Sequence, residues 1–379
     1  MPRLAIDLNK LSTAQRDAHF MSEAFKMADK GRYTTQPNPN VGCVIVKNNQ
    51  IISHGITSAV GGLHAEANAI QNAKTNLSDS TVYVTLEPCC HHGRTKPCSD
   101  ALIAIKPKRV VVASRDPNPL VAGGGVKALQ LAGIETTVGV GALQSEITYR
   151  AFFHRMRTAR PFVTLKVAMS LDGKTAMANG ESKWITSESA RKEVHKLRLT
   201  ACAVVTGVDT IIADDPQMTA RLTYAERQPK RVVLDSQTRL PANAKILRQE
   251  GETWAFQETP NEQLESENVK LFASKLNDGR IELPGLLETL AENEINHVLV
   301  EAGATLSGAF MQAGLVDEII VFMAPDVMGS DARDVFSTLG LNQMGDRICF
   351  EIKDARLIGR DIKLTLSRVQ QFPLDLETE

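Results

Sequence analysis

The apolar residues in the first part of the chain alternate between helical spacing and short continuous runs. Residues 12–31 carry apolar side chains at helical spacing and reach Gly31, which predicts a helix that stops at this glycine. Two apolar runs flank Asn48-Asn49, a pattern typical of a β-hairpin. Helical and strand-like segments then follow one another, with helices predicted at 64–74 and 123–131 and strands at 81–86, 109–114 and 134–140. Strands that alternate with helices predict a layered α/β domain.

The second part of the chain repeats this alternation. A basic, amphipathic stretch at 150–160 leads to Pro161, after which a new strand begins. A helix is predicted at 187–199, because apolar residues recur at helical spacing behind an N-cap serine or threonine. Continuous apolar runs, typical of a mostly parallel sheet, predict further strands at 201–207, 231–236, 253–257, 297–303 and 318–325, with a helix at 305–315. We therefore expect two α/β domains, 1–159 and 160–379.

Composition narrows the class of protein. The chain has 379 residues, of which 43% are hydrophobic and 23% charged, close to the globular average and unlike a disordered chain. Its 43 Lys and Arg and 44 Asp and Glu leave a net charge of -1, which excludes a bulk positive field for nucleic acid or anionic lipid. No uncharged apolar stretch reaches about 18 residues, and Asp7 and Lys10 interrupt the N-terminus, so neither a membrane span nor a signal peptide is predicted. We expect a cytoplasmic protein with reduced thiols.

Three of the six cysteines, Cys89, Cys90 and Cys98, fall within ten residues, which points to metal binding or catalysis rather than to disulfides. His64, Cys89 and Cys98 would give a catalytic zinc its three ligands and leave one position open for water. Glu66 follows His64 by two residues near a predicted helix start, where it can act as general acid and base. Zinc deaminases carry this arrangement as H-x-E followed by P-C-x-x-C, whereas here eight residues separate the two cysteines.

The loop between these cysteines carries His91, His92, Arg94 and Lys96, and therefore suits an anionic substrate. Two alternatives remain open from the residues alone. The zinc could be purely structural, with His91 or His92 as its fourth ligand, or Cys90 could replace Cys89. Asn38 lies among Asn-Pro repeats, so it is a turn residue as readily as a ligand-binding one.

The second part of the chain gives weaker chemical signals. Residues 298–308 form a strand, a small-residue turn and a helix start, which can bind phosphate through backbone N–H groups but also occurs in ordinary tight turns. Trp184 could stack on a flat ring or pack in a core, and Arg198 and Arg221 could bind phosphate or simply face solvent. Asp214-Asp215 fits a metal pair or a turn at a helix end.

Several motifs closely resemble one enzyme family along nearly the whole chain. PNPNVGCVIV (37–46), HAE (64–66) and TLEPCCHHGRTKPC (85–98) resemble the deaminase half of the bifunctional riboflavin-biosynthesis deaminase/reductases. LKVAMSLDGKTAMANGESKWIT (165–186) and VEAGATLSGA (300–309) resemble the reductase half. The resemblance implies a cytidine-deaminase-like three-layer N-terminal domain and a dihydrofolate-reductase-like C-terminal domain.

The resemblance also implies roles at individual positions. The zinc ligands fall on His64, Cys89 and Cys98, and the catalytic acid/base falls on Glu66. Substrate contacts fall on Asn38, His91, Arg94, Lys166, Ser182, Arg198, Met218, Arg221 and Glu301. NADPH contacts fall on Ala168, Trp184, Thr210, Asp214, Ser236, Gly303, Ala304, Thr305, Leu306, Ser307, Gly308 and Ala309. One position departs from the family pattern, because Thr57 stands where the family has a histidine.

The implied function is a zinc-dependent hydrolytic deamination of 2,5-diamino-6-(5-phosphoribosylamino)pyrimidin-4-one, followed by an NADPH-dependent reduction of its ribosyl chain to ribityl. Lys166 is the candidate for polarising the hydride acceptor, and the family implies a homodimer. Two rival hypotheses are a monofunctional zinc deaminase with a non-catalytic C-terminal domain, and a deaminase of nucleic-acid bases. The second rival needs a basic face and stacking aromatic residues, whereas only 5% of this chain is aromatic.

Overall fold

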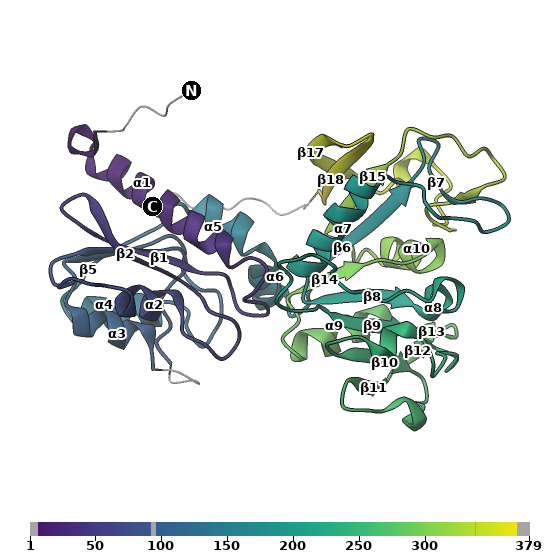
Figure 1. The fold of residues 1–379 in the computed structure, drawn as a ribbon, viewed down its shortest axis with the longest axis horizontal. Coiled ribbons are helices and arrows are strands. Elements are labelled where there is room, and N and C mark those ends of the chain that lie inside the picture. Colours follow the sequence, from purple (N-terminus) through teal and green to yellow (C-terminus); the bar gives the residue numbers. More distant parts are fainter. Residues whose placement is uncertain (1–6, 92–95, 338, 370–379) are drawn as a thin grey trace. The chain divides into compact units, whose positions relative to one another are not determined.

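The computed structural model describes residues 7–91, 96–337 and 339–369. It divides into two compact units, Met1–Arg160 and Pro161–Glu379, one residue beyond the predicted division (Figure 1). Among the described residues, no helix combines the length and the apolar character needed to cross a lipid bilayer.

The first unit is built on a five-stranded sheet with the order β2-β1-β3-β4-β5. The predicted hairpin is confirmed, because Asn48 and Asn49 both have positive φ and join its antiparallel strands in a tight turn. β1 also pairs antiparallel with β3, whereas β3, β4 and β5 run parallel. The strands are β1 (Gly42–Lys47), β2 (Gln50–Ile56), β3 (Thr81–Val84), β4 (Arg109–Val112) and β5 (Glu135–Val138).

Alternation of side chains along β1 gives this sheet two buried faces. Cys43 and Ile45 pack with residues of α2, α3 and α4, whereas Val44 and Val46 pack with residues of α1 on the opposite face. Figure 1 shows this arrangement as helices above and below the sheet. The helices are η1 (Leu8–Lys10), α1 (Thr13–Lys30), α2 (Ala65–Gln71), α3 (Cys98–Ile105), α4 (Gly124–Leu131), α5 (Ala142–Thr148) and α6 (Arg150–Thr158). The predicted three-layer α/β domain is confirmed.

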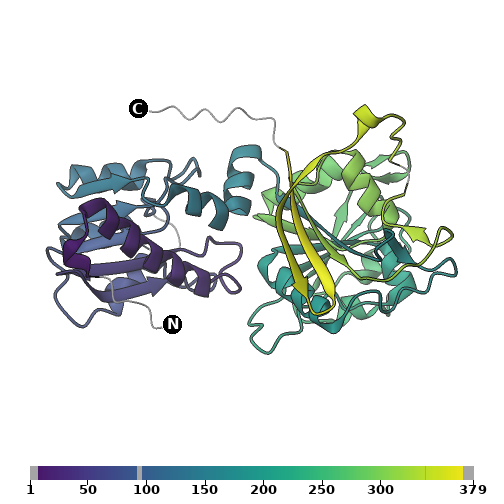
Figure 2. The ribbon, with the colours of Figure 1, turned by 90° about the horizontal axis from the view of Figure 1, so that it is seen from above.

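The second unit is built on a nine-stranded sheet with the order β11-β10-β9-β8-β14-β6-β15-β18-β17. The first seven strands in this order, β11 through β15, run parallel to one another, as predicted. β18 and β17 add an antiparallel hairpin at one edge of the sheet (yellow in Figure 2). The strands of this sheet are β6 (Phe162–Met169), β8 (Ala203–Gly207), β9 (Lys230–Leu234), β10 (Thr253–Gln257), β11 (Val269–Ala273), β14 (His297–Val300), β15 (Glu318–Met323), β17 (Phe350–Ile358) and β18 (Asp361–Arg368).

Helices cover both faces of this sheet. Leucines of α9 and Phe310 of α10 pack on one face, and α7 and α8 pack on the other. The helices are α7 (Glu188–Thr200), α8 (Val208–Asp214), η2 (Lys245–Arg248), η3 (Glu262–Leu264), α9 (Leu283–Glu292), α10 (Ala304–Gln312) and η4 (Met344–Asp346). Short two-stranded pairs join β12 (Leu276–Asn277) to β13 (Arg280–Ile281) and β7 (Lys174–Ala176) to β16 (Arg333–Asp334).

Several elements of this unit were not predicted individually from the sequence, among them α8, α9, β11 and the β17–β18 hairpin. The β17–β18 hairpin was missed because most side chains of β17 are exposed, so this strand leaves no continuous apolar run. The segment at 171–186 was not predicted to contain a strand, yet it includes β7, whose partner β16 lies more than 150 residues further along the chain.

Candidate functional site

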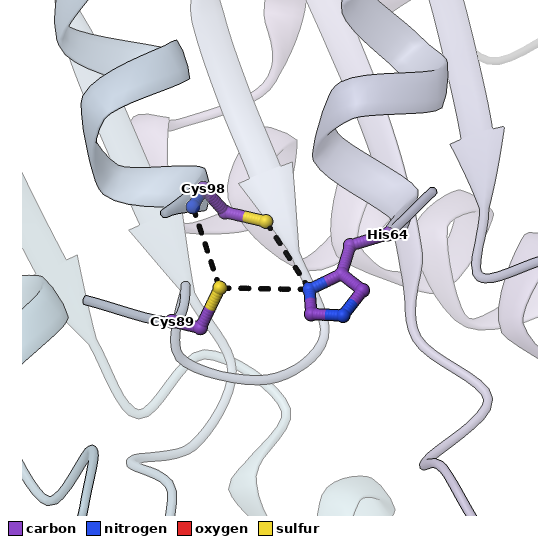
Figure 3. Close-up of side chains that lie close together, drawn as sticks. All are labelled: His64, Cys89 and Cys98. Carbon is purple, nitrogen blue, oxygen red and sulfur yellow. Dashed lines mark hydrogen bonds between the residues drawn. The ribbon is translucent and has the colours of Figure 1, made fainter. Parts of the chain in front are cut away.

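Three side chains converge where two helices and one loop of the first unit meet. His64 is the N-cap of α2, Cys98 is the first residue of α3, and Cys89 follows β3 in a loop. Nδ1 of His64 lies 3.5 Å from Sγ of Cys89 and 3.4 Å from Sγ of Cys98 (Figure 3). The two helix N-termini direct backbone N–H groups toward this cluster, and an N-terminus favours anionic sulfur.

The electrostatics of the two sulfurs suit a dication. The backbone N–H of Cys98 donates to Sγ of Cys89 at 3.3 Å. A hydrogen bond with Cys98 lowers the pKa of the Cys89 thiol, and the same bond together with burial raises the pKa of the Cys98 thiol. One thiolate and one thiol therefore share a proton that a metal ion can replace. One imidazole nitrogen and two sulfurs, all within 4.8 Å of one another, are the donor set that zinc prefers, so these residues fit the ion.

The structure bears on both alternatives for the ligand set. Sγ of Cys90 lies 3.9 Å from the carbonyl oxygens of Leu120 and Val121, and Cys89 rather than Cys90 belongs to the metal-binding cluster. Among the described residues, no fourth His, Cys, Asp or Glu joins the cluster, and His91 is exposed. His92 lies outside the described residues, as does Arg94.

Glu66 occupies the first turn of α2 and is only 3% exposed. Burial raises the pKa of its carboxyl to about 7. A nearby dication would oppose this shift by coulombic attraction. A carboxyl group that exchanges a proton near neutral pH is what general acid/base catalysis requires.

The loop that carries Cys89 is held in place by residues 116–126, which form a second loop and the first turn of α4. The buried carboxylate of Glu87 accepts hydrogen bonds from the backbone N–H groups of Asp116, Gly123 and Val126 at 3.0–3.1 Å. Gly125 packs so closely that a Cβ there would lie 1.9 Å from the carbonyl oxygen of Pro88. The glycines therefore allow this second loop to approach the cysteine loop.

We expect Gly125→Ala to displace the loop that carries Cys89, because its methyl group would meet backbone rather than a movable side chain. Overpacking of this kind costs about 1–3 kcal/mol. The melting temperature and the zinc content of purified protein should both fall, as measured by calorimetry and by elemental analysis. Ala122→Ser, a change at an exposed residue of the same loop, should alter neither. Full zinc occupancy in Gly125→Ala would contradict this reading of the glycine.

The remaining predicted residues of the first unit lie near the ends of β1 and β2. Asn38 closes a turn in which its backbone N–H donates to Thr35, and its side chain forms no hydrogen bond within the described residues. Thr57 is buried, and its hydroxyl accepts the backbone N–H of Val41 at 3.1 Å. Thr57 therefore has a structural partner at the position where the family pattern has a histidine.

The second unit contains a cavity of about 1300 Å³ at the carboxyl ends of β6, β8, β9 and β14. Open parallel sheets bind ligands at this edge. The predicted residues that line it are Lys166, Ala168, Ser182, Trp184, Arg198, Thr210, Asp214, Met218, Arg221, Ser236, Glu301, Gly303, Ala304, Thr305, Leu306, Ser307 and Ala309. Gly308 is not among these lining residues: it is buried, and a Cβ there would lie 2.6 Å from the carbonyl oxygen of Ser337, so a glycine lets α10 pack against this segment.

A charge cluster around the buried Glu301 lines the cavity. Both carboxylate oxygens of Glu301 accept hydrogen bonds from Arg198, at 2.6 and 2.9 Å, and Nζ of Lys166 lies 3.8 Å away. Arg198 and Lys166 hold the pKa of Glu301 near 2 despite its burial, whereas burial lowers the pKa of Lys166. Arg198 is thus not the solvated arginine that its type alone suggests.

The structure also distinguishes between the interpretations left open for Trp184 and for the Asp214-Asp215 pair. Trp184 is 68% exposed and lines the cavity, so it is not a core residue. Asp214 pairs with Lys183 at 2.9 Å, and Asp215 caps α8 and accepts the backbone N–H of Lys245. The aspartate pair therefore ends a helix, as the turn interpretation held.

Sequence reasoning missed two polar cavity residues on α7, Arg191 and His195. With Arg198 they form a polar stripe at i, i+4 and i+7, which is one face of a helix, and this spacing was readable in the sequence. Nδ1 of His195 accepts the backbone N–H of Arg221 at 3.2 Å, so its imidazole supports the loop that carries Arg221.

We expect His195 to make the second unit less stable in mild acid. Burial, then Arg198 and Arg221, lower its pKa from 6.5 to about 4. Between these pH values the imidazole is protonated in the unfolded chain but neutral in the folded chain. The free energy of unfolding therefore falls as the pH drops from about 6.5 toward about 4. Both tryptophans lie in the second unit, so urea titrations followed by their emission report on it alone. His195→Gln should flatten the pH dependence in this window, and an unchanged slope would argue against a partly buried, neutral imidazole.

Comparisons with known proteins agree with this geometry. Residues 161–371 match the model of the RibD C-terminal domain, and residues 14–114 match that of the cytidine and deoxycytidylate deaminase zinc-binding region. The chain is 45% identical over 364 residues to the riboflavin biosynthesis protein RibD of Escherichia coli K12, covering 93% of this chain and 99% of the relative.

Solved structures give the same result. RibD of Acinetobacter baumannii superposes with a TM-score of 0.89 at 43% identity, covering 94% of this chain and all of that one. A diaminohydroxyphosphoribosylaminopyrimidine deaminase/5-amino-6-(5-phosphoribosylamino)uracil reductase of Thermotoga maritima gives a TM-score of 0.85 at 33% identity, with the same coverage. The two predicted fold classes, cytidine-deaminase-like and dihydrofolate-reductase-like, are thereby confirmed. The resemblance seen in the motifs is confirmed as well, and the chain belongs to the family of bifunctional riboflavin-biosynthesis deaminase/reductases.

Proposed function

We propose that the first unit hydrolyses the amino group of 2,5-diamino-6-(5-phosphoribosylamino)pyrimidin-4-one with a zinc ion held by His64, Cys89 and Cys98. The observation that carries this proposal is the convergence of Nδ1 and two sulfurs beside a buried carboxylate. The name of the similar Thermotoga maritima protein describes a deaminase of this class of substrate.

The roles of the chain's own residues follow from their positions. When bound, Zn²⁺ supplies the Lewis acidity that makes water nucleophilic at neutral pH. Glu66 takes a proton from the attacking water and delivers it to the ring nitrogen. It then takes the proton of the newly added hydroxyl and passes it to the amino group, which leaves as ammonia while the hydroxyl carbon becomes a carbonyl. Asn38 holds the base, and His91 with Arg94 holds the phosphate. Arg94 enters this proposal through the family resemblance alone.

We propose that the second unit uses NADPH to reduce the ribosyl chain. Nine lysine and arginine side chains line its cavity against four aspartate and glutamate side chains, which suits a phosphorylated cofactor and a phosphorylated substrate together. NADPH supplies the hydride that adds to C1′ of the open sugar. Lys166 polarises the acceptor, Glu301 keeps Lys166 oriented, and the turn before α10 directs backbone N–H groups at the cofactor phosphates. The excess of lysine and arginine side chains in this cavity favours the bifunctional enzyme over a deaminase with a non-catalytic second domain.

The compartment and the assembly complete the proposal. Ligation by two thiolates needs reduced cysteines, which supports a cytoplasmic location. The family resemblance supports a homodimer, which light scattering on purified protein would test.

Mass analysis of the products tests the whole scheme. Zinc-replete protein incubated with the phosphoribosylamino-diaminopyrimidinone should exchange an amine for an oxygen without NADPH, and should add two hydrogens with it. Exchange without any gain of hydrogen would leave only the deaminase. No exchange at all would refute the proposed roles of His64, Cys89, Cys98 and Glu66.

A further inference from the structure

Trp184 holds an unusual position for a large aromatic side chain. It is 68% exposed, yet it lies in the wall of the second unit's cavity rather than in a core. An exposed indole on a loop normally samples several rotamers. When a ligand stacks on it, the indole loses this conformational entropy, and the binding free energy becomes less favourable. A group that fixes the indole beforehand would therefore strengthen ligand binding without touching the ligand.

Arg191 is in position to fix it. The guanidinium carbon of Arg191 lies 4.5 Å from the centroid of the Trp184 ring, within the range of a cation–π contact. Nη1 of the same side chain donates to the carbonyl oxygen of Thr186 at 2.7 Å. One side chain thus contacts both the ring and the backbone of the segment that carries it.

The base of this contact is rigid. Arg191 projects from α7, whose N-cap Ser187 donates both its backbone N–H and its hydroxyl to the carboxylate of Asp361, which is fully buried. On the other side of Trp184, Lys183 pairs with Asp214 at 2.9 Å. The segment 183–186 is therefore held at both ends, and Arg191 alone among these contacts reaches the indole.

We infer that Arg191 is a positioning residue for the reductase, which holds the indole of Trp184 in the orientation that receives the cofactor. The inference rests on the proposed use of NADPH. Arg191 acts through Trp184, so its loss should weaken NADPH binding and leave the rate at saturating NADPH close to that of the parent protein.

Tryptophan emission makes this testable, since the chain has two tryptophans and the other, Trp254, is 2% exposed. In a Trp254→Phe background, time-resolved anisotropy reports the nanosecond motion of Trp184 alone. Arg191→Met should increase this motion and raise the Kd for NADPH about three- to tenfold. Arg191→Lys should recover part of the loss, because a lysine keeps the cation but not the planar fork.

Two comparisons separate positioning from other roles. Lys192→Met removes the same charge from the next residue of α7, whose side chain pairs only with Glu188 among the described residues, and should change neither readout. In a Trp184→Ala background, Arg191→Met should have no further effect on the Kd for NADPH.

Three results decide the matter. Parental anisotropy in Arg191→Met would overturn the inference, and so would a loss of affinity that persists without Trp184, since Arg191 would then contact the cofactor itself. A parent protein that binds no NADPH would refute the proposed cofactor, and the anisotropy comparison would then decide alone whether Arg191 positions Trp184.

Discussion

Replacing Glu66 by glutamine is expected to slow ammonia release about 10²–10⁴-fold, the usual contribution of a positioned general acid/base. Glutamine has the same shape, so the buried position at the start of α2 stays filled. It cannot accept a proton from water, nor return one to the leaving amine. Release of ammonia from the phosphoribosylamino-diaminopyrimidinone measures the effect.

Two controls belong to the Glu66→Gln experiment. The variant should keep the zinc content of the parent protein, because Glu66 is not a member of the His64, Cys89 and Cys98 cluster. It should also oxidise NADPH at the parental rate when the deaminated product is supplied. Deamination at more than about a tenth of the parental rate would show that another group moves the proton.

The sequence predicted the metal cluster because its signals are local. His64 and Glu66 flank a helix start. The two cysteines stand in a polar segment between an apolar strand and a helix, so they are recognisable from their neighbours in the sequence. Chemistry alone then limits which metal such a set can hold. The Asn48-Asn49 turn was predictable for the same reason, since two adjacent residues determine its backbone.

Features that depend on distant partners were not predictable. Glu87 lies 29 to 39 residues from the N–H groups that it accepts, so nothing near it in the chain distinguishes it from a surface glutamate. The pairing of Arg198 with Glu301 spans 103 residues. Arg191 and His195 did carry a local signal, the helical spacing of polar residues, but a polar stripe on a helix usually faces solvent and only the fold turns this one toward a cavity.

Removing the carboxylate of Glu301, in the wall of the second unit's cavity, should destabilise this unit strongly. In Glu301→Gln, Arg198 and Lys166, whose side chains are 12% and 20% exposed, lie beside each other without a counter-charge. Breaking a buried ion pair on one side costs about 3–5 kcal/mol. The urea midpoint of tryptophan emission at pH 7 measures this loss, because both tryptophans lie in this unit. The deaminase activity of the first unit provides the internal control. An unchanged midpoint would mean that water reaches the cluster and screens it.

A second variant separates stability from catalysis at this site. Arg198→Met combined with Glu301→Met replaces the ion pair by apolar side chains of similar length, a change that is often neutral or stabilising in a buried setting. Burial already lowers the pKa of Lys166, so this amine can become neutral once its partner is gone. We therefore expect the double variant to regain most of the urea midpoint lost in Glu301→Gln and to remain inactive as a reductase. If reductase activity returns together with stability, Glu301 and Arg198 serve only the fold, and Lys166 does not depend on their charges to act on the substrate.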